Sequence, residues 1–387
     1  MNKLLTILCV VCYFAVISSC NKTKPEEAVE FEYNITMGDN YDNPTWYSLV
    51  DSVSYIPLKT DEKTIMDKVK QFVVKNDLIY VLANGVYCFD MDGNCKFKVT
   101  NRGRARNEFI EATTLSVSNG NMYLYDKMKG KVIVYNANTG EFIGNQDIPI
   151  GGLEVWCIGD NFIFENGNPE GRKNCKFKVF TKKRIDRERA SYFYEDEHSR
   201  SIGGTISWSN ESVLYSSFLR NIAWKIDGIE CIPYIKVIVP DEKQISDKNI
   251  KAMTTDRSIS PDDYNSPNAI YGLSYLAECD DFITGQLIEK DKPFYFIYDK
   301  KTGNSRFFRT LSDNEPWQKY PVGEGTTGDA DCIYALMPSE YVMLYKDLLG
   351  SIGKEPKESM FSKAYSVMNS MKIDDNPFIA RFWLKRL

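Results

Sequence analysis

The feature of this sequence that most constrains its fold is a repeated unit of strand-like runs joined by a tight turn. In the first copy, residues 78–82 and 86–90 are followed by a turn with Asp92 and Gly93 and by a further run at 95–99. Period-two alternation, β-branched and aromatic residues, and Asp-Gly or Thr-Gly turns are signals of antiparallel β-meanders. The unit recurs at residues 78–99, 122–143, 162–180, 213–239, 281–310 and 332–344. The sequence therefore predicts six β-meanders in series.

The spacing of these copies predicts how the meanders assemble. Tyr80 and Tyr123 hold the same place in the first two copies and lie 43 residues apart, and four-stranded propeller blades are about 40–45 residues long. A propeller ring usually closes when the two chain ends share a blade. Residues 47–58 alternate before the first copy, and residues 378–384 form an apolar run near the end. We predict an all-β, six-bladed β-propeller over residues 47–387, in which the sheet of the C-terminal strand also contains an early strand.

Two segments break this strand rhythm. Residues 241–253 have helical character and lead into a turn-rich stretch that ends at Asn268. Residues 357–371 place apolar side chains at mostly helical spacing, which is typical of a helix packed on a core. These side chains are Met360, Phe361, Tyr365, Met368 and Met371. We expect small helical insertions that lie against the propeller or close one of its mouths.

The N-terminus has the pattern of a lipoprotein signal peptide. Lys3 supplies a positive charge, and the apolar run at residues 4–17 is too short to span a hydrocarbon core as a helix. Residues 17–20 have the form of a lipobox, with a branched apolar residue and two small residues before Cys20. We predict a signal peptide at residues 1–19 and acylation of Cys20. An ordinary cleaved secretory signal with a chance cysteine is the alternative.

The residues after Cys20 predict a tether between a membrane and the folded domain. Residues 21–27 are polar, include Pro25 and show no apolar periodicity. We assign residues 20–46 to the lipidated cysteine and its tether, and each buried acyl methylene contributes about 0.8 kcal/mol to membrane anchoring. Asn21 gives no indication of retention in the inner membrane. The pattern predicts an outer-membrane lipoprotein of the cell envelope, and leaves open whether it faces the periplasm or the cell surface.

Composition and charge exclude some classes of partner. Of 387 residues 43% are hydrophobic, with 24 Tyr and 21 Phe, which indicates an ordered domain with a large core. The formal net charge of −5 does not predict binding to nucleic acid. The basic stretch at residues 172–189 has partly alternating positions that suit the solvated face of strands, although a patch for an anionic partner stays open.

The cysteines and the histidine predict neither a disulfide framework nor a metal site. Once Cys9 and Cys12 leave with the signal and Cys20 is acylated, an odd number of cysteines without tight spacing remains. His198 is the only histidine, so metal-ligand spacing is missing and we predict no metal or cofactor. Cys88 and Cys95 flank a predicted hairpin turn, and either a disulfide or two buried thiols would fit.

Several short motifs identify a family resemblance. Residues 56–58 read Ile-Pro-Leu just before the first blade, residues 79–81 and 89–93 match the first hairpin, and residues 376–377 read Asn-Pro before the last strand. On these marks residues 47–387 resemble the six-bladed β-propeller lipoproteins of Bacteroidetes, whose ring is similar to NHL-type and TolB-type propellers. The resemblance implies the fold and an envelope location, and it implies no single activity.

The loop at residues 101–109 occupies the place of a glycine-rich loop in that family. Gly103, Glu108 and Phe109 match the family loop, whereas residues 104–107 depart from it. The loop would connect the first blade to the second at the channel mouth. Alternating arginines, Arg102, Arg104 and Arg106, lie near Asn107 and Glu108 and could bind carboxylate or sulfate groups in a bidentate manner. Solvated or internally paired arginines are the alternative.

Two tryptophans, Trp208 and Trp317, lie outside the obvious strands. Their rings could stack on sugars, with packing against the fold as the alternative. Together with the arginine loop and Glu108 they are the predicted ligand-binding residues.

Catalytic motifs are missing from the sequence. Residues 90–94 open like a calcium loop but lack its later ligands, which favours a hairpin turn. His198 sits in a charged stretch that is typical of an exposed loop, and no nucleophile elbow, phosphate loop or dinucleotide fingerprint occurs. We therefore predict a non-enzymatic envelope lipoprotein that binds a glycan or a protein. The alternative is an envelope enzyme acting on polysaccharide. Buried, mutually close carboxylates beside Arg102 or Arg106 at the mouth would favour the enzyme, and a neutral mouth would favour binding.

Overall fold

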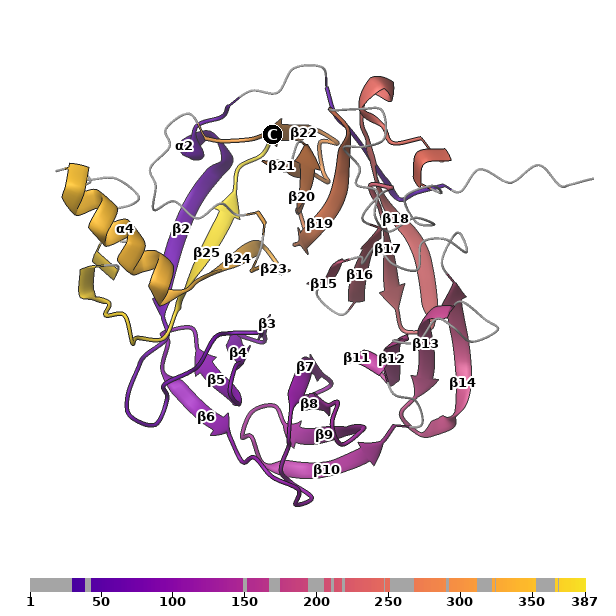
Figure 1. Cartoon of the computed structure of the whole chain (residues 1–387), viewed down its shortest axis with the longest axis vertical. Helices are drawn as coiled ribbons and strands as arrows, with labels where there is room; N and C mark the ends of the chain where they lie inside the picture. The colour runs from indigo at the N-terminus through magenta and orange to yellow at the C-terminus, as the bar shows by residue number, and fades with distance from the viewer. Residues whose placement is uncertain are drawn as a thin grey trace, which may run out of the picture.

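The structure is a computed structural model in which most of the ring can be described. The described residues are 30–38, 43–148, 152–166, 175–193, 205–209, 212–217, 220–246, 248–250, 268–289, 292–311, 322–323, 325–352, 366–367 and 369–387. Their strands form six four-stranded antiparallel blades around a central axis (Figure 1). The predicted all-β, six-bladed propeller is confirmed.

Five blades are meanders of consecutive strands. Blade 1 contains β3 (Gln71–Lys75), β4 (Leu78–Leu82), β5 (Val86–Asp90) and β6 (Cys95–Val99). Blade 2 contains β7 (Ala112–Ser118), β8 (Asn121–Asp126), β9 (Lys131–Asn136) and β10 (Phe142–Asp147). Blade 3 contains β11 (Gly152–Ile158), β12 (Asn161–Asn166), β13 (Cys175–Thr181) and β14 (Arg184–Phe193). Blade 4 contains β15 (Thr205–Ser209), β16 (Ser212–Ser217), β17 (Ile222–Asp227) and β18 (Glu230–Ile238). Blade 5 contains β19 (Ile270–Glu278), β20 (Phe282–Glu289), β21 (Lys292–Asp299) and β22 (Ser305–Phe308).

The sixth blade is built from both ends of the chain. It contains β23 (Thr326–Asp329), β24 (Cys332–Met337), the C-terminal β25 (Phe378–Leu384) and the early strand β2 (Val50–Pro57). β2 pairs antiparallel with β25, so that Tyr55 lies opposite Ala380. The predicted sharing of the last sheet is therefore confirmed. The early strand begins only at Val50, because a short helix α2 (Trp46–Leu49) precedes it, capped by the Thr45 hydroxyl, which accepts from Ser48 N at 3.1 Å.

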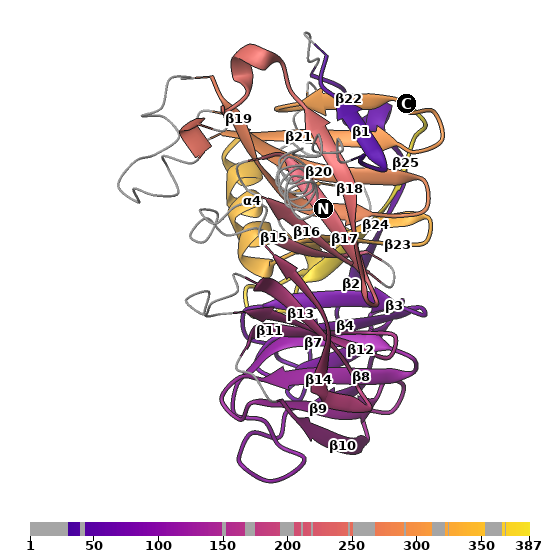
Figure 2. The same ribbon diagram turned by 90° about the vertical axis from the view of Figure 1, so that its right-hand side faces the viewer.

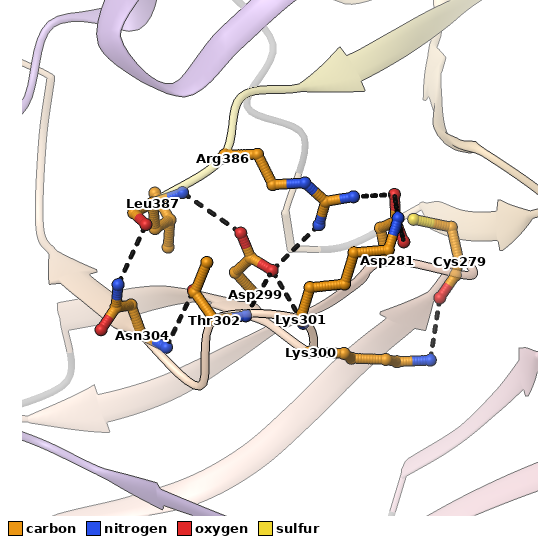
Figure 3. A network of polar contacts seen from close by, with 9 residues as sticks. All are labelled: Cys279, Asp281, Asp299, Lys300, Lys301, Thr302, Asn304, Arg386 and Leu387. Carbon is orange, nitrogen blue, oxygen red and sulfur yellow. Dashed lines mark hydrogen bonds and ion pairs between the residues drawn. The ribbon is translucent and has the colours of Figure 1, made fainter.

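The C-terminal residues after β25 lock onto the neighbouring blade 5 (Figure 3). Asp299, at the end of β21, accepts hydrogen bonds from Arg386 Nη1 at 2.9 Å and from the backbone N–H of Leu387 at 3.3 Å. Arg386 also pairs with Asp281, and Asn304 Nδ2 donates to the Leu387 oxygen at 3.0 Å. This group of contacts, which we call the C-terminal clasp, ties blade 6 to blade 5.

Several hairpin turns are held by the same type of hydrogen bond, in which an Asp or Asn side chain accepts from backbone N–H groups of its own turn. Asp90 Oδ1 accepts from the backbone N–H of Asp92 and Asn94 at 3.1 and 2.8 Å, and Gly93 takes a φ of 75°. Equivalent side chains, Asn136 and Asp299, accept from the amides of their own turns. Residues 90–94 are therefore a hairpin turn, as favoured from the sequence, and the described part of the chain contains no cluster of His, Cys, Asp and Glu suited to a metal ion.

The core lies between neighbouring blades. On β4, Tyr80 and Leu82 pack toward blade 2, whereas Ile79 and Val81 pack toward blade 6. Because both faces of a blade are covered, such a strand is apolar along its whole length.

The side chains of Cys88 and Cys95 lie on opposite faces of blade 1. Cys88 is opposite Phe97 and packs in the core shared with blade 2, whereas Cys95 is opposite Phe89 and packs toward blade 6. Both are free thiols. The disulfide that the spacing permitted is therefore not formed, because a shift in strand register separates the two side chains.

The insertions differ in part from expectation. The strand of the sixth copy ends at Met337, and α4 (Ser339–Ile352) follows at once, where the sequence pattern predicted strand to residue 344. A 3₁₀ turn, η2 (Asp241–Lys243), and helical residues at 248–250 agree with the helical character of that segment. Most of the helix expected at 357–371 lies outside the described residues. In the described part of the chain no helix is long and apolar enough to cross a membrane.

The segment expected as a tether contains one further strand. β1 (Tyr33–Thr36) pairs in parallel with the outer strand β18 of blade 4, so that Tyr33 lies opposite Ile235. Ile35 and Met37 are buried between blades 4 and 5. The folded unit therefore begins before residue 47, because the apolar side chains of this short strand fill a junction between two blades.

Candidate functional site

The two faces of the ring differ in the length of the connections that they carry. Strands alternate in direction within a blade, so successive connections emerge at opposite faces. One, the short-turn face, carries the described residues 76–77, 91–94, 119–120, 137–141, 159–160, 182–183, 228–229, 279–281, 300–304 and 330–331. The other, the long-loop face, carries the long connections 58–70, 100–111, 239–269 and 338–377. Figure 2 shows the ring edge-on, with α4 at the left and the turn between β21 and β22 at the right.

Neutral polar groups join the inner strands of blades 1, 2 and 3. Gln71 on β3 donates to the carbonyl of Leu115 on β7 at 2.8 Å and accepts from its N–H at 2.9 Å. Ser116 Oγ accepts from Cys157 N on β11 at 3.0 Å. Ser118 Oγ accepts from Gly159 N at 3.1 Å. These contacts join the inner strands to one another, and Lys70, just before β3, adds a charged contact by donating from Nζ to the Ala112 carbonyl of β7 at 3.3 Å.

The inner strands converge at the short-turn face. Ser209 on β15 forms a parallel bridge with Gly328 on β23, although their blades are not neighbours. A Cβ at Gly328 would lie 1.9 Å from the Glu278 carbonyl oxygen, so only glycine allows this approach. Burial raises the pKa of Asp329, and the nearby Asp280 carboxylate adds to the effect. Asp329 and Asp280 therefore lie at the short-turn end of the ring, opposite the long loops.

The arginine loop at residues 100–111 is held in one shape by its own side chains. Glu108 Oε2 accepts from the backbone N–H of Ala105 at 2.9 Å and lies against Gly103, where a Cβ would be 2.1 Å away. Lys129 Nζ donates to the carbonyls of Ala105 and Glu108 at 2.9 and 2.6 Å. Glu108 is thus a structural residue of the loop, and the backbone of the loop is fixed onto blade 2.

The arginines of this loop lie at the rim of the ring. Arg106 stacks on Phe142 of the outer strand β10, with its guanidinium 5.8 Å from the ring centre. Arg102 donates to the Asn84 carbonyl at 3.2 Å and lies 6.0 Å from the Phe109 ring. All three arginines are exposed. The loop connects blades 1 and 2 as predicted, but it lies over the outer strands and not at the channel mouth, because Asn145 and Tyr135 also hold it there.

Of the two tryptophans, Trp208 alone lies in the described part of the chain. Trp208 lies within the inner strand β15, opposite Val213, where the sequence pattern placed it outside a strand. Its neighbours Ser207 and Ser209 are small and polar, which weakens the strand signal. Trp317, His198 and Cys20 lie outside the described residues.

A buried carboxylate between blades 4 and 5 was not found from the sequence. Glu278, 3% exposed, accepts from the Tyr234 hydroxyl and pairs with Lys300. Lys225 Nζ is 3.9 Å from its other oxygen. Burial raises the pKa of Tyr33, which lies beside this group, to about 12, and Glu32 adds to the shift. The partners of Glu278 come from β17, β18 and the turn after β21, so nothing in sequence spacing marks this group.

Two lysine contacts of this kind hold blade junctions together. Lys182, in the basic stretch expected to be solvated, donates to the Tyr123 hydroxyl and to the Gly159 carbonyl, both at 2.6 Å. On the long-loop face, Glu289 pairs with Lys243 at 3.2 Å and with Arg309, which fixes η2 to blade 5. Glu289 is 4% exposed. These groups stabilise packing between blades and provide no pair of close carboxylates.

The sequence from residue 32 to residue 382 matches the model of a family described as Domain of unknown function (DUF4934). The chain belongs to this family. The DUF4934 match spans β1 to β25, which agrees with a folded unit that includes the strand before residue 47. The predicted six-bladed propeller family is confirmed in its fold, whereas acylation of Cys20 stays a prediction.

Solved structures were compared with this ring, and one of them supports its fold. A Bacteroides fragilis protein described as exported superposes with a TM-score of 0.69 at 13% identity, covering 92% of this chain and 99% of that one. A DUF4221 member from Bacteroides vulgatus has a TM-score of 0.48 at 9% identity, covering 87% and 97%. Virginiamycin B lyase from Staphylococcus aureus has a TM-score of 0.38 at 11% identity, covering 73% and 80%. The Bacteroides fragilis structure supports the fold, whereas the TM-scores of the other two are too low to support a conclusion. No curated protein matches the sequence.

Proposed function

We propose that this protein is a non-catalytic binding lipoprotein of the cell envelope, which recognises its ligand with the long-loop face. The observation that carries this proposal is the difference between the two faces of the ring. The described connections of the short-turn face are brief, whereas the connections that begin and end at the opposite face include the long ones at residues 100–111, 239–269 and 338–377. Long connections on a rigid scaffold are where proteins place variable recognition groups.

The described side chains favour binding over catalysis. The buried Glu289 is neutralised by Lys243 and Arg309, and the exposed arginines of the 100–111 loop have no pair of buried carboxylates among their described contacts. Burial raises the pKa of Cys157 to about 11 and of Cys332 to about 12, so these thiols are protonated and poorly nucleophilic at neutral pH.

The ligand class that fits the arginine loop is a glycan with carboxylate or sulfate groups. Arg102, Arg104 and Arg106 are exposed on a backbone already held by Glu108 and Lys129. A preformed loop loses less conformational entropy on binding, and guanidinium groups pair with such anions in a bidentate manner. An acidic envelope protein offers the same anionic chemistry and is the other partner that this loop would accept.

The proposed location is the outer membrane, with the chain held by acylated Cys20. The lipobox at residues 17–20 and the polar stretch after it support this location. The related Bacteroides fragilis structure is of a protein described as exported, which is in keeping with it.

Binding to an array of anionic and neutral glycans tests the proposal. The chain from residue 21 to residue 387 is compared with a variant carrying Arg102→Ala, Arg104→Ala and Arg106→Ala. We expect saturable binding to anionic glycans that weakens about tenfold or more in the variant, a loss of about 1.4 kcal/mol. A charge-matched control changes three exposed lysines outside this loop, Lys68, Lys96 and Lys236, to Ala.

The outcomes separate the alternatives. Equal loss in both triple variants would mean that net charge, and not the loop, drives binding. Absence of binding to every glycan would remove sugars as ligands. Release of new reducing ends from any glycan would contradict the non-catalytic assignment.

A further inference from the structure

The N-terminal strand fixes where the chain leaves the ring. Beyond the paired residues of β1, Glu32 N donates to the Pro233 carbonyl at 3.3 Å and Met37 N donates to the Ile238 carbonyl at 2.9 Å. Ile35 is fully buried and packs with blades 4 and 5. Residues 32–37 are therefore part of the outer edge of blade 4.

The direction of β1 determines the side from which the preceding residues approach. β1 runs parallel to β18, and Tyr33 lies opposite Ile235. Residues before Tyr33 therefore extend toward the beginning of β18 at Glu230. The turn before that strand, residues 228–229, belongs to the short-turn face. The chain reaches the ring at the corner where blade 4 meets this face.

The length of the preceding chain limits how far this corner lies from an anchor at Cys20. Twelve positions separate Cys20 from Glu32. A chain of that length spans about 40 Å at most, when fully extended. A ring of this size is about 50 Å across. The corner of blade 4 must therefore lie closer to the anchor than the distant blades do.

The surface of this corner carries two exposed isoleucines among exposed acidic residues, which include Glu32 and Asp227. Ile229 in the turn is 45% exposed, and Ile232 on β18 is 37% exposed. Phe31, half-buried, precedes β1. The flanking residues Glu30 and Glu230 are acidic and exposed, so this surface suits an uncharged lipid interface better than an anionic one.

We infer that the blade 4 corner, formed by Phe31, Ile229 and Ile232, rests on the bilayer that holds the lipid anchor. This inference depends on the acylation of Cys20 in the proposed function. It orients the ring, because a short-turn corner at the membrane directs the long-loop face away from the bilayer. The loop at residues 100–111 is then presented to ligands in the surrounding space.

Energy transfer from the ring to the bilayer tests this orientation. The acylated full-length protein is reconstituted in phosphatidylcholine vesicles that contain an acceptor lipid. A donor dye is attached at Ile229→Cys or, as the matched control, at Ile143→Cys on the outer strand of blade 2, where the native side chain is 54% exposed. Unsubstituted protein corrects for labelling of native thiols. Transfer should be about twofold stronger or more from position 229, because the tether is short compared with the ring.

Each outcome bears on a separate step. Equal transfer from positions 229 and 143 would overturn the orientation while the anchor holds. Failure of the protein to float with the vesicles would overturn acylation, and with it this inference. In a second variant, Ile232→Asp is combined with the dye at position 229. Transfer should fall about twofold with flotation unchanged, because the corner loses apolar contact. Unchanged transfer would contradict the contact of these isoleucines with lipid.

Discussion

Buried carboxylates at the blade junctions act as cross-links between strands that are distant in the sequence. Glu278 at the end of β19 pairs with Lys300 and accepts from Tyr234 of the preceding blade. The side chain of Lys300 is only 14% exposed, and it also donates to the Cys279 carbonyl at 2.9 Å. Removing one member of such a group leaves a buried charge without its counter-charge.

The change Glu278→Ala should therefore lower the free energy of unfolding by about 3–5 kcal/mol. Urea unfolding of the mature chain measures this loss. The matched control is Glu111→Ala at an exposed position, which should stay within about 0.5 kcal/mol of the parent. Similar losses in the two variants would mean that Glu278 contributes no specific cross-link.

Asp299 predicts a dependence of stability on pH. Burial opposes its ionisation, but the backbone N–H groups of Lys301, Leu387 and Thr302 and the Arg386 guanidinium hold its pKa below the ordinary value. A carboxyl whose pKa is lower in the folded state stabilises that state above the unfolded pKa of about 3.9. This stabilisation is lost as the pH falls through the lower, folded value.

The change Asp299→Asn should lower stability at neutral pH and also reduce the loss of stability between about pH 5 and pH 2. Urea unfolding at several pH values tests both effects. Asp92→Asn, at an exposed turn residue, is the control and should keep the acid dependence of the parent. If the Asp299→Asn variant and the parent lost stability equally in acid, the clasp carboxylate would not be a source of that dependence.

At the scale of single elements, the short strand β1 is stabilised by its contacts with two blades and not by its length. It has only four residues, YNIT in sequence, and pairs on one side with β18. Tyr33 packs edge-on against Tyr234 with ring centres 5.2 Å apart, and Ser305 Oγ donates to the Thr36 carbonyl at 3.0 Å. Contacts with both blade 4 and blade 5 therefore hold it.

The change Ile35→Ala should release β1 before the rest of the ring unfolds. Deleting buried methyl groups from a packed aliphatic side chain costs about 2–5 kcal/mol, which exceeds what a four-residue edge strand can sustain by hydrogen bonds alone. Hydrogen exchange should become faster at Met37, while the amides of β17 keep the protection of the parent. Faster exchange throughout blade 4 would instead show that β1 and the blade unfold as one unit.

At the scale of the whole molecule, the ring depends on one strand from each end of the chain. β25 lies between β24 and β2, and it pairs with both along its length. The residues beyond it form the C-terminal clasp on blade 5 and bond to the helix α2, where Lys385 N donates to the Leu49 carbonyl at 2.9 Å. Closure of the ring by β25 and its attachment to blade 5 by the C-terminal clasp thus contribute separately to the stability of the fold.

Two truncations should separate these contributions. A chain ending at Leu384 keeps β25 and should fold, with a lower melting temperature because the partly exposed clasp contributes only about 1–2 kcal/mol. A chain ending at Pro377 lacks β25 and should show no cooperative thermal transition, because β2 and β24 are left with open edges. Calorimetry distinguishes the two. Cooperative melting of the shorter chain would contradict closure by the terminal strand.

Local signals in the sequence were enough to predict the repeat, the propeller and the sharing of blade 6. Alternation, aromatic strands and turns such as 90–94 and 299–303 act over a few residues and recur at a regular spacing. The resemblance of residues 56–58 and 376–377 to the family pattern added the envelope expectation. The exposed arginines of the 100–111 loop were also identified, because an alternating basic run in a loop is visible in the sequence.

Where those residues lie in space depends on the tertiary structure. Arg106 lies at the rim and not at the expected channel mouth, because Phe142, from another strand, provides its stacking surface. The buried Glu278 and the docked strand β1 depend on partners far along the chain. Cys88 and Cys95 are separated by one shift in register. Such features depend on contacts between distant residues, which spacing in a sequence does not contain.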